Sequence, residues 1–142
     1  MTDQLLSGIN HVALAASDVD VTVAFYCDAF GLEATDFSVG DDRSVLLLFP
    51  DGSFVQVLDA GSAPTVSAPV REEPGNLIHE GAPLDHFSLF AVDTDALDVI
   101  RDRLVALEAT DGVIIDTAGV ASTVRFTDPD GRLLEVTAYP KP

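Results

Sequence analysis

Apolar and polar residues alternate in short runs along this chain, and two longer runs carry apolar residues at helical spacing. In the first half, alternation with a period of two predicts strands on both sides of one such longer run. That run, SDVDVTVAFYCDAFG, offers Ser17 or Asp18 as N-cap and Gly31 as its end, which predicts a helix. The strands expected in this half are Ile9–Ala15, Glu33–Val39, Ser44–Phe49 and Phe54–Leu58.

The second half repeats this order of elements. A strand is expected over His86–Val92, followed by a helix in VDTDALDVIRDRLVAL with Thr94 or Asp95 as N-cap. In both halves Pro-Asp-Gly joins the last two strands, which is a strong hairpin signal. Each half is therefore predicted to be a βαβββ module, and the fold class to be α+β. The last three strands of this half are expected at about Gly112–Ile115, Thr123–Thr127 and Leu133–Ala138.

Shared letters between the two halves indicate an internal duplication. LEATD occurs at Leu32–Asp36 and at Leu107–Asp111, an offset of 75 residues that also places His11 on His86. Further along, FPDGSFVQV aligns with DPDGRLLEV at an offset of 79, which places Gln56 on Glu135. We attribute the shift to four extra residues in GVIIDTAGVAST, and we expect the two LEATD segments to occupy equivalent places.

The length of 142 residues suits a single domain with one ordinary core. Residues 60–83 are rich in proline and glycine and have no sustained period, so they are interpreted as a linker. The expected organisation is therefore one domain, with module one at about 8–59 and module two at about 84–139.

Acidic residues dominate the charge of the chain. The 24 Asp and Glu residues stand against seven Lys and Arg, a formal charge of -17 that disfavours nucleic acid and anionic membranes as partners. Acidity spread along the whole chain is typical of a solvated surface in a salty cytoplasm, and an acidic groove for a cationic ligand is the alternative. The N-terminus lacks the pattern of a secretory signal, and Cys27 is the only cysteine, so a cytoplasmic location is expected.

The predicted topology brings polar residues of each module together. After a helical crossover and a three-strand meander, the fourth strand returns beside the first, so His11 neighbours Gln56 and His86 neighbours Glu135. Strand alternation directs these four side chains away from an apolar face and toward small residues such as Ala13. Two imidazoles, a carboxylate and an amide oxygen suit zinc, nickel, cobalt, manganese or ferrous iron, so we predict one divalent metal per site. A buried polar network is the alternative.

At these residues the chain resembles the vicinal oxygen chelate superfamily, the glyoxalase, bleomycin resistance protein and dioxygenase group. The resemblance rests on NHVALAASDVDVTVAFYCDAFGLEA, LDHFSLFAVD and FTDPDGRLLEVTAY. It implies two βαβββ modules related by a pseudo-twofold axis, forming a cupped, incomplete eight-stranded barrel. It also implies metal ligands at His11, Gln56, His86 and Glu135, and a frequent homodimer whose site is completed within one chain or across two.

The resemblance implies a metal-dependent lyase or isomerase that chelates a small substrate and stabilises an enediolate or enolate. The ligand set is similar to that of methylmalonyl-CoA epimerases, and differs from bacterial glyoxalase I by Gln56 where a glutamate is usual. Glu135, transiently released from the metal, is the expected catalytic base, and a metal-bound hydroxide is the alternative. Arg43 and Arg125, predicted on the third strand of each module, are candidates for holding a substrate carboxylate. A bleomycin-resistance-type binding protein without chemistry and an Fe(II) extradiol-type dioxygenase are the alternatives. The fosfomycin-modifying relatives are disfavoured because VIIDTAGVAST has no lysine or tyrosine.

Overall fold

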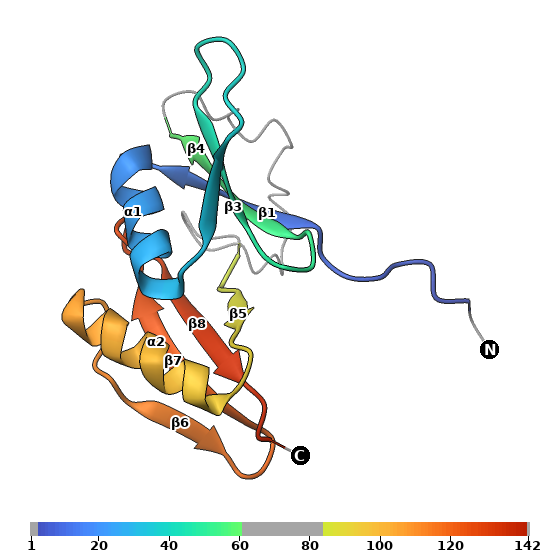
Figure 1. Ribbon diagram of the computed structural model, residues 1–142, viewed down its shortest axis with the longest axis vertical. Helices are drawn as coiled ribbons and strands as arrows, with labels where there is room; N and C mark the ends of the chain where they lie inside the picture. Colours follow the sequence, from blue (N-terminus) through green and yellow to red (C-terminus); the bar gives the residue numbers. More distant parts are fainter. Residues whose placement is uncertain (1–2, 61–83, 142) are drawn as a thin grey trace, which may run out of the picture. The chain divides into compact units, whose positions relative to one another are not determined.

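The computed structural model describes residues 3–60 and 84–141, and the chain divides into two compact units, Met1–Ala63 and Pro64–Pro142. Apart from Ala60, the predicted linker lies outside the described residues. Among the described residues each unit contains one helix and one four-stranded sheet (Figure 1). The βαβββ order and the α+β class predicted from the sequence are confirmed.

The first unit is a mixed sheet with a helix on one side. Its strands follow the order β1-β4-β3-β2, in which β1 and β4 are parallel and the other neighbours antiparallel. The helix between β1 and β2 makes the parallel pairing possible, because parallel strands need a long crossover connection. The elements are β1 (His11–Ala16), α1 (Val19–Phe30), β2 (Glu33–Asp36), β3 (Ser44–Leu48) and β4 (Phe54–Asp59).

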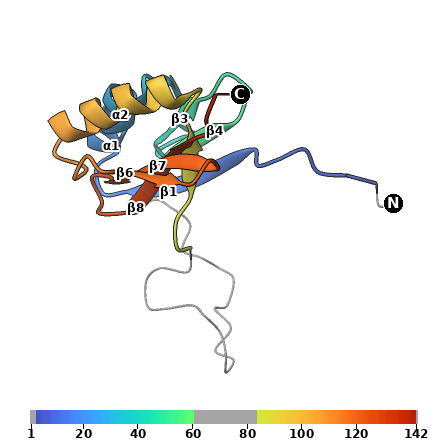
Figure 2. The same ribbon diagram turned by 90° about the horizontal axis from the view of Figure 1, so that it is seen from below.

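The second unit has the same topology. Its strand order is β5-β8-β7-β6, again with a parallel first pair, β5 and β8. The view in Figure 2 shows α2 on one side of the strands of its own unit. The elements are β5 (Ser88–Phe90), α2 (Thr94–Ala106), β6 (Ile114–Thr117), β7 (Ala121–Thr127) and β8 (Leu133–Ala138).

Helix α1 begins and ends where its caps dictate. The Asp18 carboxylate accepts a hydrogen bond from the backbone N–H of Val21, and Gly31 ends the helix at a φ of 68°. The buried face of α1 packs on β3 and β4, whose helix-facing side chains are also buried. The core of this unit comprises Leu14, Ala16, Val19, Tyr26, Ala29, Val45, Leu47, Val55 and Val57.

The N-cap of helix α2 is Asp93, which corrects the prediction of Thr94 or Asp95. The Asp93 carboxylate accepts a hydrogen bond from the backbone N–H of Ala96 at 2.8 Å, so the helix starts one residue early. Leu97 and Leu104, seven residues apart, face the sheet and pack on β7 and β8. The buried strand residues below them are Val124, Phe126, Leu134, Val136 and Ala138.

Several predicted strands are too long or displaced. Strand β2 ends at Asp36 rather than Val39, because the Asp36 carboxylate accepts bonds from the backbone N–H and hydroxyl of Ser38 and forms a local turn. Strand β5 is reduced to three residues of the predicted His86–Val92. Strand β6 begins at Ile114, two residues later than predicted.

The two LEATD segments do not occupy equivalent places, which corrects the prediction from the repeat. Leu32–Asp36 supplies β2, whereas Leu107 is the C-cap of α2 and Glu108 takes a φ of 56°. The extra residues of the second unit lie between α2 and β6, at 107–113, where the first unit has only Gly31 and Leu32; this corrects their attribution to GVIIDTAGVAST. The duplication still stands, because the helices start at an offset of 75 (Val19, Thr94) and β4 and β8 at 79 (Phe54, Leu133).

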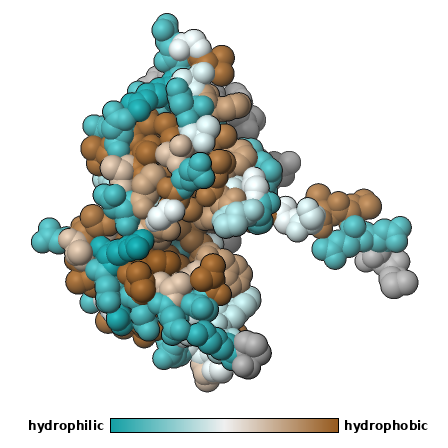
Figure 3. Space-filling view, in the orientation of Figure 1, coloured by the Kyte–Doolittle hydropathy of each residue, from teal (hydrophilic) through white to brown (hydrophobic). Residues whose placement is uncertain are grey.

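Hydrophilic side chains cover much of the visible surface of both units, with apolar patches between them (Figure 3). Within residues 3–60 and 84–141, no helix is long and apolar enough to cross a membrane.

Candidate functional site

His11 and Gln56 share one face of the first sheet. Gln56 is the cross-strand partner of Ala13, and His11 lies two residues before Ala13, so both side chains point away from helix α1. The neighbouring residues Val55 and Val57 point the other way and are buried under the helix. The register of β1 on β4 therefore brings the two residues to diagonal positions on one face, as the sequence predicts.

Each of these side chains has a defined partner. The His11 ring lies parallel to the Phe54 ring, with centroids 4.7 Å apart, and its Nδ1 donates to the Asn10 side-chain oxygen at 2.7 Å. The Gln56 side-chain nitrogen donates to the hydroxyl of Ser44 at 2.9 Å, and Ser44 is itself buried. These contacts fix the imidazole and the amide on the polar face of this sheet.

His86 and Glu135 form the corresponding pair in the second unit. Glu135 is the cross-strand partner of Ser88, and its backbone N–H donates to the carbonyl of Phe87. His86 lies just before β5, and its Nε2 is 3.6 Å from Oε2 of Glu135. The Nδ1 of His86 donates to the Asp85 carboxylate at 2.6 Å. The hydrogen bond to Asp85 raises the pKa of His86, and the negative charge of Glu135 adds to this against the effect of burial.

Arg125 lies beside Glu135 on the same face. The two residues are cross-strand partners on β7 and β8, and Nε of Arg125 donates to Oε1 of Glu135 at 3.3 Å. The Arg125 side chain is 58% exposed, whereas that of Glu135 is 20% exposed. Glu135 is therefore held between a cation on one oxygen and an imidazole near the other.

Arg43 is placed differently from Arg125, its predicted counterpart in the second unit. It precedes β3 rather than lying on it, and it forms an ion pair with Asp20 in the first turn of α1. The hydrogen bond from Arg43 lowers the pKa of Asp20. Because Arg43 pairs with the helix on one side of the sheet and Gln56 points to the other, the structure separates Arg43 from the polar face.

The donors of each pair suit a divalent cation. His86 Nε2 and Glu135 Oε2 are 3.6 Å apart, less than two metal–ligand bonds of about 2.0–2.2 Å end to end, so one ion can contact both atoms. In residues 3–60 and 84–141 no group of three His, Cys, Asp or Glu side chains forms a metal site. Three of the four predicted ligands are His or Glu, and they are divided between the two units, His11 in the first and His86 and Glu135 in the second.

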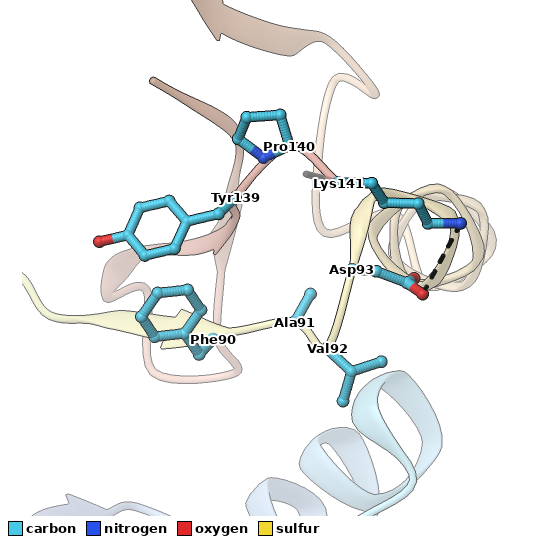
Figure 4. A pocket seen from close by; sticks show the side chains of 7 residues that line it. All are labelled: Phe90, Ala91, Val92, Asp93, Tyr139, Pro140 and Lys141. Carbon is cyan, nitrogen blue, oxygen red and sulfur yellow. Dashed lines mark ion pairs between the residues drawn. The ribbon is translucent and has the colours of Figure 1, made fainter. Parts of the chain in front are cut away.

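Two pockets lie in the second unit, apart from the predicted ligands. One, of about 420 Å³, is formed by the ends of β5 and β8 and the start of α2 (Figure 4). The rings of Phe90 and Tyr139 meet edge to face on one side of it, and Lys141 reaches Asp93 on the other at 4.0 Å. The second pocket, of about 370 Å³, includes Arg125 and residues 108–111 of the second LEATD segment among its lining residues. No motif in the sequence indicated either pocket.

Asn10, Ser44 and Asp85 were not predicted from the sequence as partners of the predicted ligands. Asn10 and Asp85 occupy equivalent positions, each directly before a predicted histidine, so the repeat itself could have pointed to them. Ser44 could not be found this way, because its counterpart at the offset of 79 is Thr123, which pairs with Thr137 instead.

Comparison with known proteins places the chain in a family. The sequence profile of the Glyoxalase/Bleomycin resistance protein/Dioxygenase superfamily matches residues 8–136. The chain belongs to this superfamily, as the sequence motifs indicated.

Individual relatives cover nearly the whole chain. The virulence protein STM3117 of Salmonella typhimurium is 26% identical over 138 residues, covering 95% of this chain and 86% of the relative. A lactoylglutathione lyase from Agrobacterium tumefaciens is 25% identical with a TM-score of 0.68, covering 95% of this chain and 96% of that structure. The fosfomycin resistance protein FosX of Listeria monocytogenes, solved with Mn(II) and sulfate, has a TM-score of 0.60 at 20% identity, covering 94% and 93%. At that identity the likeness to FosX shows the fold alone.

Proposed function

We propose that this protein is a metal-dependent enzyme, a glyoxalase-like lyase or isomerase acting on a small oxygen-chelating substrate. His11, Gln56, His86 and Glu135 hold one divalent cation, which is zinc, nickel, cobalt, manganese or iron. The observation that supports this most is the 3.6 Å separation of His86 Nε2 and Glu135 Oε2, with a second His and an amide at the repeated positions of the first unit. The Mn(II) bound by the relative FosX is consistent with a divalent ion.

The ligand chemistry favours an ion with open coordination positions. Two neutral imidazoles, one carboxylate and one amide leave a divalent cation with net positive charge. Such an ion supplies a Lewis acid that polarises adjacent oxygens of a bound substrate. The lactoylglutathione lyase among the structural relatives is consistent with this class of chemistry.

Glu135 is the proposed catalytic base. Once released from the cation, its Oε2 would accept a proton from the substrate carbon next to the chelated oxygens, while Arg125 donates to Oε1 at 3.3 Å. Arg125 is also the proposed partner for a substrate carboxylate, since its exposed guanidinium has further N–H donors. Arg43 is not proposed for this role, because it is paired with Asp20 on the helix side of the sheet.

Metal analysis tests the ligand set. After reconstitution with each candidate metal and dialysis, we expect about one divalent ion per chain. The variant His86→Ala should lose the ion, whereas His79→Ala, which removes the one histidine outside the predicted set, should retain it. Wild-type protein that binds no ion with any of the five metals would contradict the proposed enzyme and favour a bleomycin-resistance-type binding protein.

Activity assays test the reaction class. The reconstituted protein should turn over either a methylglyoxal hemithioacetal or an acyl-CoA epimer, and Glu135→Gln should abolish that activity. Oxygen-dependent turnover of catechols by the iron-loaded protein would instead support the dioxygenase alternative. We also propose a homodimer, for which light scattering should give twice the 15.0 kDa mass of one chain.

A further inference from the structure

Three side chains form hydrogen bonds with the predicted ligands. Each bonds to the atom of its ligand that is not needed to bind a metal. In both histidines the ring nitrogen with a hydrogen-bond partner is Nδ1. Asn10 accepts from Nδ1 of His11 at 2.7 Å, and Asp85 accepts from Nδ1 of His86 at 2.6 Å. A carboxylate can only accept, so Nδ1 of His86 must carry the proton, and in the neutral ring Nε2 keeps its lone pair.

The repeat places these two partners at matching positions. Asn10 and Asp85 are 75 residues apart, the same offset as His11 and His86. Each accepts from the histidine that follows it, so the arrangement needs no other element of the fold. The two units differ in charge, however, since one histidine meets a neutral amide and the other a carboxylate.

Gln56 shows the same arrangement with a different partner. Its side-chain nitrogen donates to the hydroxyl of Ser44 at 2.9 Å, and Ser44 is only 5% exposed. The backbone N–H of Ser44 donates to the hydroxyl of Ser38 at 3.2 Å, which ties the two serines together. Because the Gln56 nitrogen donates to Ser44, the side-chain oxygen of Gln56 remains as the possible metal ligand. Oxygen is also the amide atom that a hard or borderline cation prefers.

We propose that Asn10, Asp85 and Ser44 are positioning residues that select the metal-binding atom of each ligand, namely Nε2 of His11, Nε2 of His86 and the side-chain oxygen of Gln56. The role of these residues in metal binding rests on the proposed function. The selection of the atoms is a property of the metal-free protein. A residue that is hydrogen-bonded to a metal ligand orients that ligand before the ion binds, and removing such a residue typically weakens metal affinity about 10–100-fold.

Nitrogen NMR of the metal-free protein tests the selection directly. At a pH where both rings are neutral, the ¹⁵N shifts of His11 and His86 should report the tautomer with the proton on Nδ1. In Asp85→Ala the His86 ring should shift toward the tautomer with the proton on Nε2, and Asp85→Asn, which retains an acceptor oxygen, should restore the native shift. Asn10→Ala should act in the same way on His11 and leave His86 unchanged.

Metal titration gives the second readout. Asp85→Ala and Ser44→Ala should each bind the metal about 10–100-fold more weakly than wild type, and Asp85→Asn should recover most of the affinity. Circular dichroism of every variant should match wild type, which excludes unfolding as the cause.

The proposal would be overturned by native histidines protonated on Nε2, or by tautomers that do not respond to Asp85→Ala and Asn10→Ala. It would also be overturned if these variants bind metal as tightly as wild type. If the native rings carry the proton on Nδ1 and respond as expected but wild-type protein binds no metal, the selection of atoms is supported and the proposed function fails instead.

Discussion

The ion pair between Arg43 and Asp20 connects the first turn of α1 to the segment that enters β3. Both side chains are largely exposed, so the pair contributes little to stability by itself. Its measurable consequence is the ionisation of Asp20, whose pKa is lowered first by the hydrogen bond from Arg43. A group with a lowered folded pKa stabilises the fold above its unfolded pKa and loses that contribution as pH falls through the folded value.

Removing Arg43 should therefore raise the pKa of Asp20 toward its usual value of 3.8. The measurement is a carboxyl ¹³C titration of wild type and Arg43→Ala between pH 2 and pH 6. Asp51, whose pKa is lowered by Ser53 instead, is the internal control and should titrate identically in both proteins. An unchanged Asp20 titration would show that the ion pair does not form in solution.

Glu108 carries the strain that glycine avoids in the other unit. Both helices are followed by a left-handed residue, Gly31 with a φ of 68° and Glu108 with a φ of 56°. A residue with a Cβ pays roughly 1 kcal/mol or more in this region, which glycine does not.

Glu108→Gly should raise the free energy of unfolding by up to about 1 kcal/mol. Glu108→Ala is the matched control, because it removes the same side chain but keeps the Cβ and should give no such gain. Urea unfolding of the three proteins measures the difference. Equal stability of the glycine and alanine variants would show that the conformation at 108 carries no strain.

At this scale the sequence predicted residue positions better than residue contacts. His11 and Gln56 share a face as predicted, because strand parity depends only on spacing along the chain. The partner of Arg43 could not be predicted in the same way, since it depends on a helix that crosses the sheet 23 residues away in sequence. Asp20 and Asp18 both lie near the helix start, and only the structure separates the cap from the ion-pair partner.

At the scale of elements, both helices start at an aspartate whose side chain accepts a bond from a backbone N–H three residues on. The prediction for α1 included Asp18, whereas that for α2 missed Asp93 by one residue. VDTDALD offers three successive capping candidates, and propensity alone does not rank them. Strand β8 was predicted to the residue because the Pro-Asp-Gly turn fixes its start and its alternation is unbroken.

Replacing the α1 cap should lower stability measurably. Asp18→Ala removes the acceptor for the Val21 backbone N–H and should cost about 0.5–2 kcal/mol, while Asp18→Ser should retain most of the native stability. The free energy of unfolding from urea titrations checks both. A loss as large in the serine variant as in the alanine variant would point to the charge of Asp18 rather than its cap.

At the scale of the whole molecule, the formal charge of -17 opposes folding through repulsion among carboxylates spread along the chain. Only seven basic residues are available to offset it, and among them Arg43, Arg101, Arg125, Arg132 and Lys141 pair with acidic groups. The remaining repulsion is long-range, and salt screens it over a Debye length of about 10 Å at 0.1 M.

The midpoint of thermal unfolding should therefore rise when NaCl increases from about 0.01 M to 1 M at pH 7. The same salt series near pH 4.1, the isoelectric point of the sequence, is the control and should produce a much smaller rise. Calorimetry measures both. A midpoint that is independent of salt at pH 7 would show that the acidic surface does not limit stability.

The sheet topology also has a consequence for biosynthesis. All four strands of the first sheet lie within residues 11–59, and the two sheets share no strand. Strand β1 has no sheet neighbour until β4 has been synthesised, about forty residues later. No strand beyond β4 is needed to complete the first sheet. We expect nascent chains that are stalled after the first unit has cleared the ribosome to resist proteolysis over residues 11–59. This protection should appear before Glu135, the partner of His86, has been synthesised. The two halves of the proposed centre would then be folded one after the other, in the order in which they are translated.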